Sequence, residues 1–343
     1  MAMVGVDTDM DLASVLIPGV RLRRLRHHPQ LRELTSEHRL SVKDLVLPLF
    51  IKEGIPIRQP IPAMPGHDQI SLDQLPEEIK TIERLRIPAV ILFGIPNEKN
   101  ATGSAAIRPD GIIQRAIACI KRETRHVLVI ADLCFCEYTD HGHCGMVHRS
   151  LTGTWDVDND QTLEHLVKQA VSLAQAGADV IAPSGMMDGM VRALRNGLDQ
   201  AGFVQLPILS YAVKYASALY EPFRAAAEGA PQWGDRRSYQ MDPAQAHMAL
   251  REAALDVEEG ADLLMVKPGL PYLDIIYRVK QQFPSVPLGA YQVSGEFAMI
   301  KAASAQGWLD EKAVMLESLL ALKRAGADFI ITYFAKQAAE VLR

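Results

Sequence analysis

The chain has 343 residues, of which 48% are hydrophobic and 22% charged, and its formal net charge is −5. This is ordinary globular composition, with enough length to bury a large core. It argues against a nucleic-acid binder, which shows a basic face, and against a membrane protein, because the apolar runs are only of strand length. The first twenty residues lack the pattern of a secretory signal, so we expect a cytoplasmic protein.

Residues 1–40 differ from the rest of the chain. The stretch RLRRLRHHPQLRELTSEHRL (21–40) is basic and weakly patterned, with no clear place in a core. The pattern alone leaves two interpretations open. The segment is either a tail without a packing partner or an arm that packs on a neighbouring subunit.

From residue 45 onward, short apolar runs alternate with helix-patterned stretches. Runs that are apolar on both faces and separated by amphipathic helices indicate parallel strands covered by helices. Eight such units are the number that closes a parallel barrel, so we predict a (β/α)8 TIM barrel over residues 41–343 with an extended N-terminal arm. A doubly wound open sheet is disfavoured, because no strand is followed by a G-x-G-x-x-G loop. The predicted strands are 45–51, 89–95, 126–134, 178–184, 207–213, 261–268, 287–293 and 328–335.

A partial internal repeat supports this organisation. Three segments each end a predicted helix on glycine and enter a strand through Ala-Asp, so the aspartate lies where the strand begins. They are QAGADVIAPS (175–184), EEGADLLMVKPG (258–269) and RAGADFIITYFA (324–335).

Polar side chains gather where the predicted strands end. In a barrel of this kind the active site lies at the carboxyl ends of the strands, so these side chains are candidates for one shared site. They are Asp132, Cys134, Cys136, Ser184, Ser210, Tyr211, Lys214, Lys267, Tyr291, Gln292, Ser294 and Tyr333.

Two lysines stand at neighbouring strand ends, Lys214 in SYAVKYAS and Lys267 in LLMVKPGLPYLD. Burial and a nearby like charge both disfavour the protonated amine. A neutral amine attacks ketones and forms a Schiff base, which is the chemistry we expect here. The alternative is that each lysine pairs with an aspartate or a phosphate.

Three cysteines crowd into the segment DLCFCEYTDHGHCG (132–145). On an extended segment, C-x-C points both sulfurs the same way. Three thiolates with one open position are typical of a catalytic zinc site, so Cys134, Cys136 and Cys144 are the predicted ligands. His141 and His143 are further candidates that fit loop or substrate-facing positions better. The alternative is that the cysteines are small apolar residues, as we expect for Cys119.

A long insertion, YEPFRAAAEGAPQWGDRRSYQMDP (220–243), follows the strand that carries Lys214. Loops of this length over a barrel are often lids. Arg224, Arg236, Arg237 and Gln240 supply forked donors that suit a carboxylate. The alternative for any one of these arginines is a solvated surface position.

Taken together, these segments resemble the porphobilinogen synthase (5-aminolevulinate dehydratase) family, from about residue 20 to the C-terminus. The resemblance implies condensation of two 5-aminolevulinate molecules to porphobilinogen, with loss of two waters, in tetrapyrrole (heme) biosynthesis. There are two alternatives: another Schiff-base (class I) aldolase on the same barrel, and a non-catalytic zinc-binding assembly protein. The matching segments are RLRRLR, DLCFCEYTDHGHCG, APSGMMDGMV, SYAVKYAS, GDRRSYQMDP, LLMVKPGLPYLD, GAYQVSGE and TYFAKQAAE.

The resemblance also implies residue roles. Lys267 would form the Schiff base with the first-bound substrate (the P side) and Lys214 with the second (the A side). Asp132 matches an active-site carboxylate, and we expect it to assist proton transfer. The three cysteines match the zinc-binding version of the family, and Glu252 matches a glutamate that holds an allosteric magnesium. The remaining matches are Ser294 and Tyr333 for the P-side carboxylate, Arg224, Arg236 and Gln240 for the A-side carboxylate, and Ser184 and Tyr220 as pocket residues.

Family members assemble as homo-octamers in which the N-terminal arm embraces a neighbour, which favours the arm interpretation of residues 1–40. One departure concerns the motif S-D-M-M-D-G-R of many members. Here Gly185 and Met190 replace its first aspartate and its arginine. This puts local ion pairs in doubt, but not the lysine chemistry.

Overall fold

The structure is a computed structural model that describes residues 20–150 and 153–342. Contacts within the chain divide it between Arg39 and Leu40 into two units. Residues 1–19 of the predicted arm lie outside the described residues, and its predicted subunit contacts remain a prediction.

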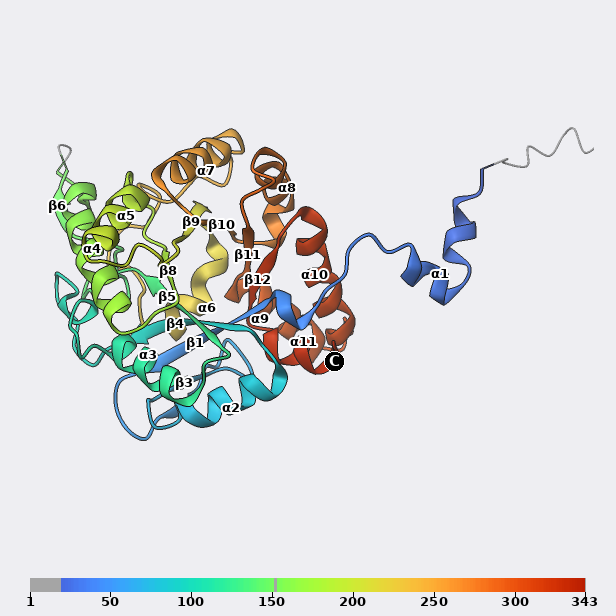
Figure 1. Cartoon of the computed structure of the whole chain (residues 1–343), viewed down its shortest axis with the longest axis horizontal. Coiled ribbons are helices and arrows are strands. Elements are labelled where there is room, and N and C mark those ends of the chain that lie inside the picture. Colours follow the sequence, from blue (N-terminus) through green and yellow to red (C-terminus); the bar gives the residue numbers. More distant parts are fainter. Residues whose placement is uncertain (1–19, 151–152, 343) are drawn as a thin grey trace, which may run out of the picture. The chain divides into compact units, whose positions relative to one another are not determined.

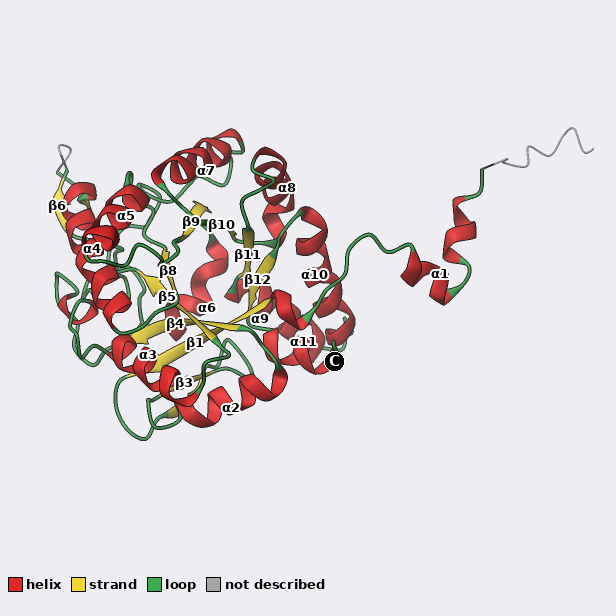
Figure 2. Ribbon diagram, in the orientation of Figure 1, coloured by secondary structure: helices red, strands yellow, loops and turns green. Residues whose placement is uncertain are grey.

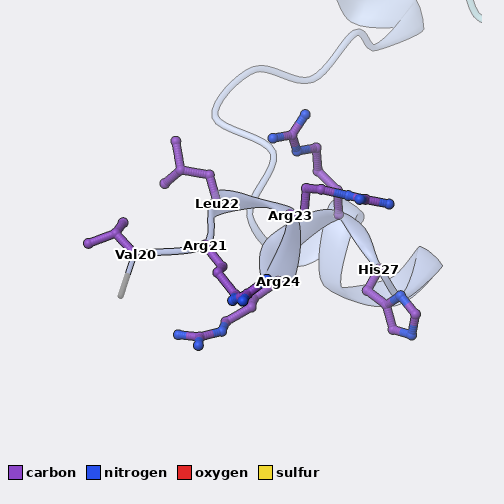
Figure 3. Close-up of a pocket in the computed structure, with 7 residues that line it drawn as sticks. Val20, Arg21, Leu22, Arg23, Arg24 and His27 are labelled. Carbon is purple, nitrogen blue, oxygen red and sulfur yellow. The ribbon is translucent and has the colours of Figure 1, made fainter. Parts of the chain in front are cut away.

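The described part of the first unit, residues 20–39, is helical and contains no buried residue. It holds a 3-10 helix, η2 (Leu22–Arg26), and α1 (Pro29–Leu34), neither of which buries a residue. A hollow of about 720 Å³ beside η2 is lined by Val20, His27 and the residues between them except Leu25. Figure 3 shows these side chains extending outward from the turn. The hollow contains none of the predicted site residues.

In the second unit, eight parallel strands among the described residues form a nearly closed barrel (Figure 1), which confirms the predicted fold. Their spatial order is β8-β5-β4-β1-β12-β11-β10-β9, and a parallel bridge between Ile181 and Ile208 joins the two ends. The strands are β1 (Leu45–Lys52), β4 (Ala89–Ile95), β5 (Leu128–Leu133), β8 (Val180–Pro183), β9 (Leu209–Lys214), β10 (Leu263–Lys267), β11 (Leu288–Gln292) and β12 (Phe329–Thr332).

Helices surround these strands, as Figure 2 shows. No helix in the described part of the chain is long and apolar enough to cross a membrane. The helices are α2 (Leu75–Leu85), α3 (Ile112–Glu123), α4 (Asn159–Gln175), α5 (Met190–Gln200), α6 (Glu221–Ala226), α7 (His247–Glu259), α8 (Leu273–Gln282), α9 (Ser294–Ala305), α10 (Glu311–Ala325) and α11 (Ala335–Val341), with 3-10 helices η3 (Val42–Asp44), η4 (Ser104–Ala106), η5 (Ala218–Tyr220) and η6 (Leu270–Tyr272).

Two short hairpins interrupt the β/α alternation. β2 (Arg58–Pro60) pairs with β3 (Asp68–Ile70), which also extends the sheet beside β1, and β6 (Val147–Arg149) pairs with β7 (Trp155–Val157). These strands were not predicted, because segments of three residues are too short to show a period.

The repeated Gly-Ala-Asp segments join helices to strands. Gly260 and Gly326 end α7 and α10 in the left-handed conformation that glycine adopts most readily. The aspartate two residues later bonds to the adjacent strand segment: Asp262 accepts a hydrogen bond from the Ile208 N–H at 2.8 Å. Asp328 accepts one from the Leu288 N–H at 2.7 Å. These carboxylates therefore satisfy backbone donors at the amino-terminal end of the barrel.

Candidate active site

Two lysines end neighbouring strands. Lys214 is the last residue of β9 and Lys267 the last of β10, and the two are partners in the strand register. Their exposed fractions are only 5% and 6%. Lys214 Nζ donates a hydrogen bond to the Ser184 carbonyl oxygen at 2.6 Å. The register therefore places both amines at the same end of the barrel.

The Lys267 amine lies among aromatic rings. Its Nζ is 4.1 Å from the ring centroid of Tyr291 and 5.1 Å from that of Tyr211. The rings of Tyr220 and Phe223 lie 5.4 and 5.3 Å away. Burial, reinforced by the positive charge of Lys214, lowers the pKa of Lys267 to about 7. A large fraction of this amine is therefore a neutral nucleophile near neutral pH.

Asp132, at the end of β5, faces the lysines with a partly unsatisfied carboxyl group. Ser184 Oγ donates to its Oδ2 at 3.1 Å, whereas Oδ1 is buried without a hydrogen-bond partner. Burial and the nearby Glu137 carboxylate raise the pKa of Asp132 to about 7. A carboxyl group with this pKa can accept and return a proton near neutral pH.

These groups share a cavity of about 20 Å³, which is room for about one water. Three lining residues, Phe93, Glu137 and Phe223, were not predicted from the sequence. Glu137 could have been predicted as a site residue, because it is an acidic residue directly after the C-x-C motif. The full lining is Phe93, Asp132, Cys136, Glu137, Ser184, Lys214, Tyr220, Phe223, Arg224, Arg236 and Lys267.

The three predicted metal ligands form a cluster. The sulfurs of Cys134, Cys136 and Cys144 all lie within 4.8 Å of one another, and all three residues are buried. The expected extended segment is wrong: Cys134 follows the end of β5, and residues 135–138 form a bend and turn. The turn still brings Cys134 Sγ to 3.4 Å from Cys136 Sγ. Hydrogen bonds from the other two thiols lower the pKa of Cys144.

This thiol cluster fits a soft metal ion. Three convergent thiolates are a ligand set that zinc prefers, and they leave a fourth position for a small molecule. The two histidines of the segment do not compete for the ion, because their ring nitrogens are engaged elsewhere. His141 bonds to the His143 N–H and lies 3.2 Å from the Ala101 carbonyl oxygen, and His143 bonds to Trp233 and Tyr239.

The predicted donors of the lid (residues 220–243) line two different hollows. Arg224 and Arg236 line the lysine cavity, whereas Gln240 lines a second cleft of about 390 Å³. Arg236 donates to the Gly142 carbonyl oxygen at 2.8 Å. The Nε atoms of both arginines, and both amide atoms of Gln240, are buried without partners. Arg237 is exposed and pairs with Asp235.

Besides Ser184, three more hydroxyl residues predicted around the substrate lie near the same mouth: Ser294, Tyr333 and Tyr220. Ser294 Oγ accepts a hydrogen bond from the Phe223 N–H at 2.9 Å. The hydroxyls of Tyr333 and Tyr291 are 3.1 Å apart, and the Tyr291 ring is the nearest aromatic neighbour of the Lys267 amine. Tyr220 donates to the Tyr215 carbonyl oxygen at 2.7 Å. Ser294 and Tyr333 therefore adjoin the lining rather than form it.

Glu252 lies apart from the lysines. It is on α7 and lines the second cleft together with Asp156, Asp188 and Asp242. Burial, with the nearby Asp188 charge, raises the pKa of Glu252.

The two residues that depart from the family motif lie next to each other. A Cβ on Gly185 would stand 3.7 Å from the sulfur of Met190. The two departures from the motif are therefore neighbours in space.

The fold and these side chains define a (β/α)8-barrel enzyme with two buried lysine amines at the carboxyl ends of its strands. The delta-aminolevulinic acid dehydratase family matches residues 19–341. The chain belongs to this family, whose members are lyases.

Named relatives cover almost the whole chain. The delta-aminolevulinic acid dehydratase of Halalkalibacterium halodurans is 55% identical over 322 residues, which are 94% of this chain and 96% of that protein. The one from Synechocystis is 52% identical and covers 96% of this chain and 100% of its own length. A crystal structure of the Toxoplasma gondii enzyme with its reaction product porphobilinogen is 42% identical, with a TM-score of 0.90, and covers 94% of this chain and 91% of that one.

Proposed function

We propose that this protein condenses two 5-aminolevulinate molecules into porphobilinogen with loss of two waters, as a step of tetrapyrrole (heme) biosynthesis. Family membership supports the reaction. The observation that carries the proposal is the register pairing of Lys214 and Lys267 at one buried mouth. Two amines allow two ketones to be activated side by side, whereas a class I aldolase needs only one.

The chemistry proposed for the lysines follows from their surroundings. The neutral Lys267 amine attacks the ketone carbon of the first substrate, and loss of one water gives a Schiff base. Lys214 is proposed to form a Schiff base with the second ketone, with loss of the second water. A protonated Schiff base acidifies the adjacent carbon, and Asp132 is the group proposed to take up that proton. Holding both substrates in one orientation selects one of the possible couplings.

We also propose that Cys134, Cys136 and Cys144 hold zinc. The support is a buried cluster of three sulfurs that adjoins the lysine cavity through Cys136. A bound zinc ion supplies Lewis-acid polarisation of a substrate oxygen or binds its amine. Unchanged zinc content in a Cys134→Ala variant would refute this ligand set.

The lid donors are proposed to bind the A-side carboxylate. Arg224, Arg236 and Gln240 each have a buried donor atom without a hydrogen-bond partner. A bound carboxylate would accept hydrogen bonds from these donors. A cavity of about 20 Å³ is far below the roughly 300 Å³ of the smallest common ligand pockets. Substrate entry therefore requires the lid to move. Ser294 and Tyr333 are proposed for the P-side carboxylate, with Ser184 and Tyr220 as neighbouring pocket residues.

Three further proposals concern regulation and assembly. Glu252 is proposed to hold an allosteric magnesium, supported by its acidic cleft; a Glu252→Gln variant that keeps its full response to magnesium would contradict this.

The arm is proposed to pack on a neighbour in a homo-octamer, supported by the exposed Val20, Leu22 and Leu34. Light scattering that gives one size with and without residues 1–39 would contradict it.

The cytoplasm is the proposed location, because free thiols suit a reducing compartment. Cell fractionation tests this proposal.

The proposed reaction is tested directly by incubating the protein with 5-aminolevulinate and assaying porphobilinogen colorimetrically. We expect product formation that a zinc chelator abolishes and added zinc restores. A Lys267→Ala variant is expected to lose at least about a thousandfold in turnover, because the nucleophile is gone. Full turnover by that variant would contradict the proposal.

A further inference from the structure

The middle of the lid rests on the cysteine loop (residues 134–145). Gln232 donates its backbone N–H to the His141 carbonyl oxygen at 3.0 Å. Arg236 bridges the two segments, donating to Gly142 O at 2.8 Å and to Gly229 O, within the lid, at 2.7 Å. The lid is therefore bound to the segment that carries the three thiols.

The backbones of the two segments approach each other closely at glycines. A Cβ on Gly142 would lie 2.2 Å from the Ala230 carbonyl oxygen, and one on Gly229 would lie 3.0 Å from the Cys136 carbonyl oxygen. At Gly142 a Cβ would clash with the lid backbone, and at Gly229 it would make a tight contact with the cysteine loop. A change in the path of the cysteine loop is therefore transmitted to the lid backbone.

His143, next to Cys144, makes three side-chain contacts with the lid. Its ring stacks on Trp233 with centroids 3.9 Å apart. Nε2 lies 3.0 Å from the Trp233 carbonyl oxygen, which only accepts, so Nε2 carries the proton. Nδ1 of the neutral ring then accepts from the Tyr239 hydroxyl at 3.0 Å. Both nitrogens of this buried ring are thus used to hold the lid.

These contacts flank the proposed substrate clamp. Trp233 precedes Arg236 by three residues, and Tyr239 directly precedes Gln240. Tyr239 also packs against the three cysteines. Whatever fixes the position of Cys144 and His143 therefore also fixes the part of the lid that presents Arg236 and Gln240.

We propose that His143 is a positioning residue that couples metal occupancy of the three cysteines to closure of the lid. The inference rests on the metal site proposed above. A metal ion fixes the cysteine loop, the fixed loop holds His143 in place, and His143 seats Trp233 and Tyr239. Without the ion, the loop gains freedom and the lid loses its support.

Limited trypsin digestion with and without a zinc chelator tests this coupling, with cleavage after Arg237 followed by mass spectrometry. Removing zinc from the wild-type protein is expected to raise the cleavage rate about tenfold, because hydrogen bonds that hold the lid are lost. His143→Ala is expected to be cleaved at the fast rate whether or not zinc is present, while its zinc content per chain stays at the wild-type value. Tyr239→Phe removes one of the two hydrogen bonds of the His143 ring. With zinc present, its cleavage rate should therefore lie between those of the wild-type protein and His143→Ala.

His126→Ala, at an exposed histidine before β5, is the matched control and should retain zinc-dependent protection. The proposal is overturned if zinc does not protect the wild-type lid, if His143→Ala keeps zinc-dependent protection, or if that variant loses its zinc. The product assay is a separate readout. A wild-type protein that shows zinc-dependent protection but forms no porphobilinogen refutes the proposed reaction and upholds the coupling.

Discussion

At the scale of single residues, the surroundings of Lys267 oppose a positive charge on its amine. The side chain is buried among four aromatic rings, and the nearby Lys214 adds like-charge repulsion. Four rings near a cation can stabilise it, but burial has the larger effect here, since the pKa is lowered. Burial and the Lys214 charge therefore favour the neutral, nucleophilic form of the Lys267 amine.

The pH dependence of Lys267 provides a prediction. Because its pKa is lowered to about 7, the neutral fraction rises with pH through 7 and then levels. Trapping of 5-aminolevulinate by cyanoborohydride should rise in the same way. Lys214→Met removes the like charge that lowers the pKa of Lys267. The pKa of Lys267 should then rise, so the midpoint of trapping should move to higher pH.

Lys168→Met, at an exposed position of α4, is the control and should leave that midpoint unchanged. A midpoint that Lys214→Met leaves in place, or moves to lower pH, would show that the two amines do not interact in the way proposed.

At the scale of elements, the sequence was informative where a pattern is periodic. Both lysines end apolar runs, so their adjacency follows once eight parallel strands are recognised. The turn at residues 135–138 was not predictable from spacing, because alternation suggests an extended segment. The second cleft was also missed, since Asp156, Asp188 and Asp242 are far apart along the chain.

The aspartates of the repeat give a stability prediction. Asp328 accepts from the buried Leu288 N–H at 2.7 Å and pairs with Lys280 at 2.8 Å. Asp328→Ala leaves that backbone donor without a partner, so the free energy of unfolding should fall by about 2 kcal/mol. Urea unfolding measures this. Glu164→Ala, at an exposed site on α4, should change it by less than about 0.5 kcal/mol. Equal effects of the two substitutions would contradict the capping role.

At the scale of the whole molecule, the barrel determines which distant segments meet. Residues from β4, β5, β9, β10 and the lid line a single cavity, although they span residues 93–267. The barrel was predictable from periodicity, and five lining residues were predictable because they lie at strand ends: Asp132, Cys136, Ser184, Lys214 and Lys267. The lid arginines were predictable from the long insertion, and Tyr220 only from the family resemblance. Phe93 and Phe223 were not predictable, because apolar residues at a mouth look the same in sequence as residues of the core.

The central claim is that two buried lysines each capture a ketone at one mouth. It is tested by reducing the protein in the presence of 5-aminolevulinate and mapping the modified peptides by mass spectrometry. We predict adducts on Lys267 and Lys214, with exposed lysines such as Lys168 unmodified. A protein that forms porphobilinogen but carries no adduct on Lys267, or carries adducts only on exposed lysines, would contradict the account.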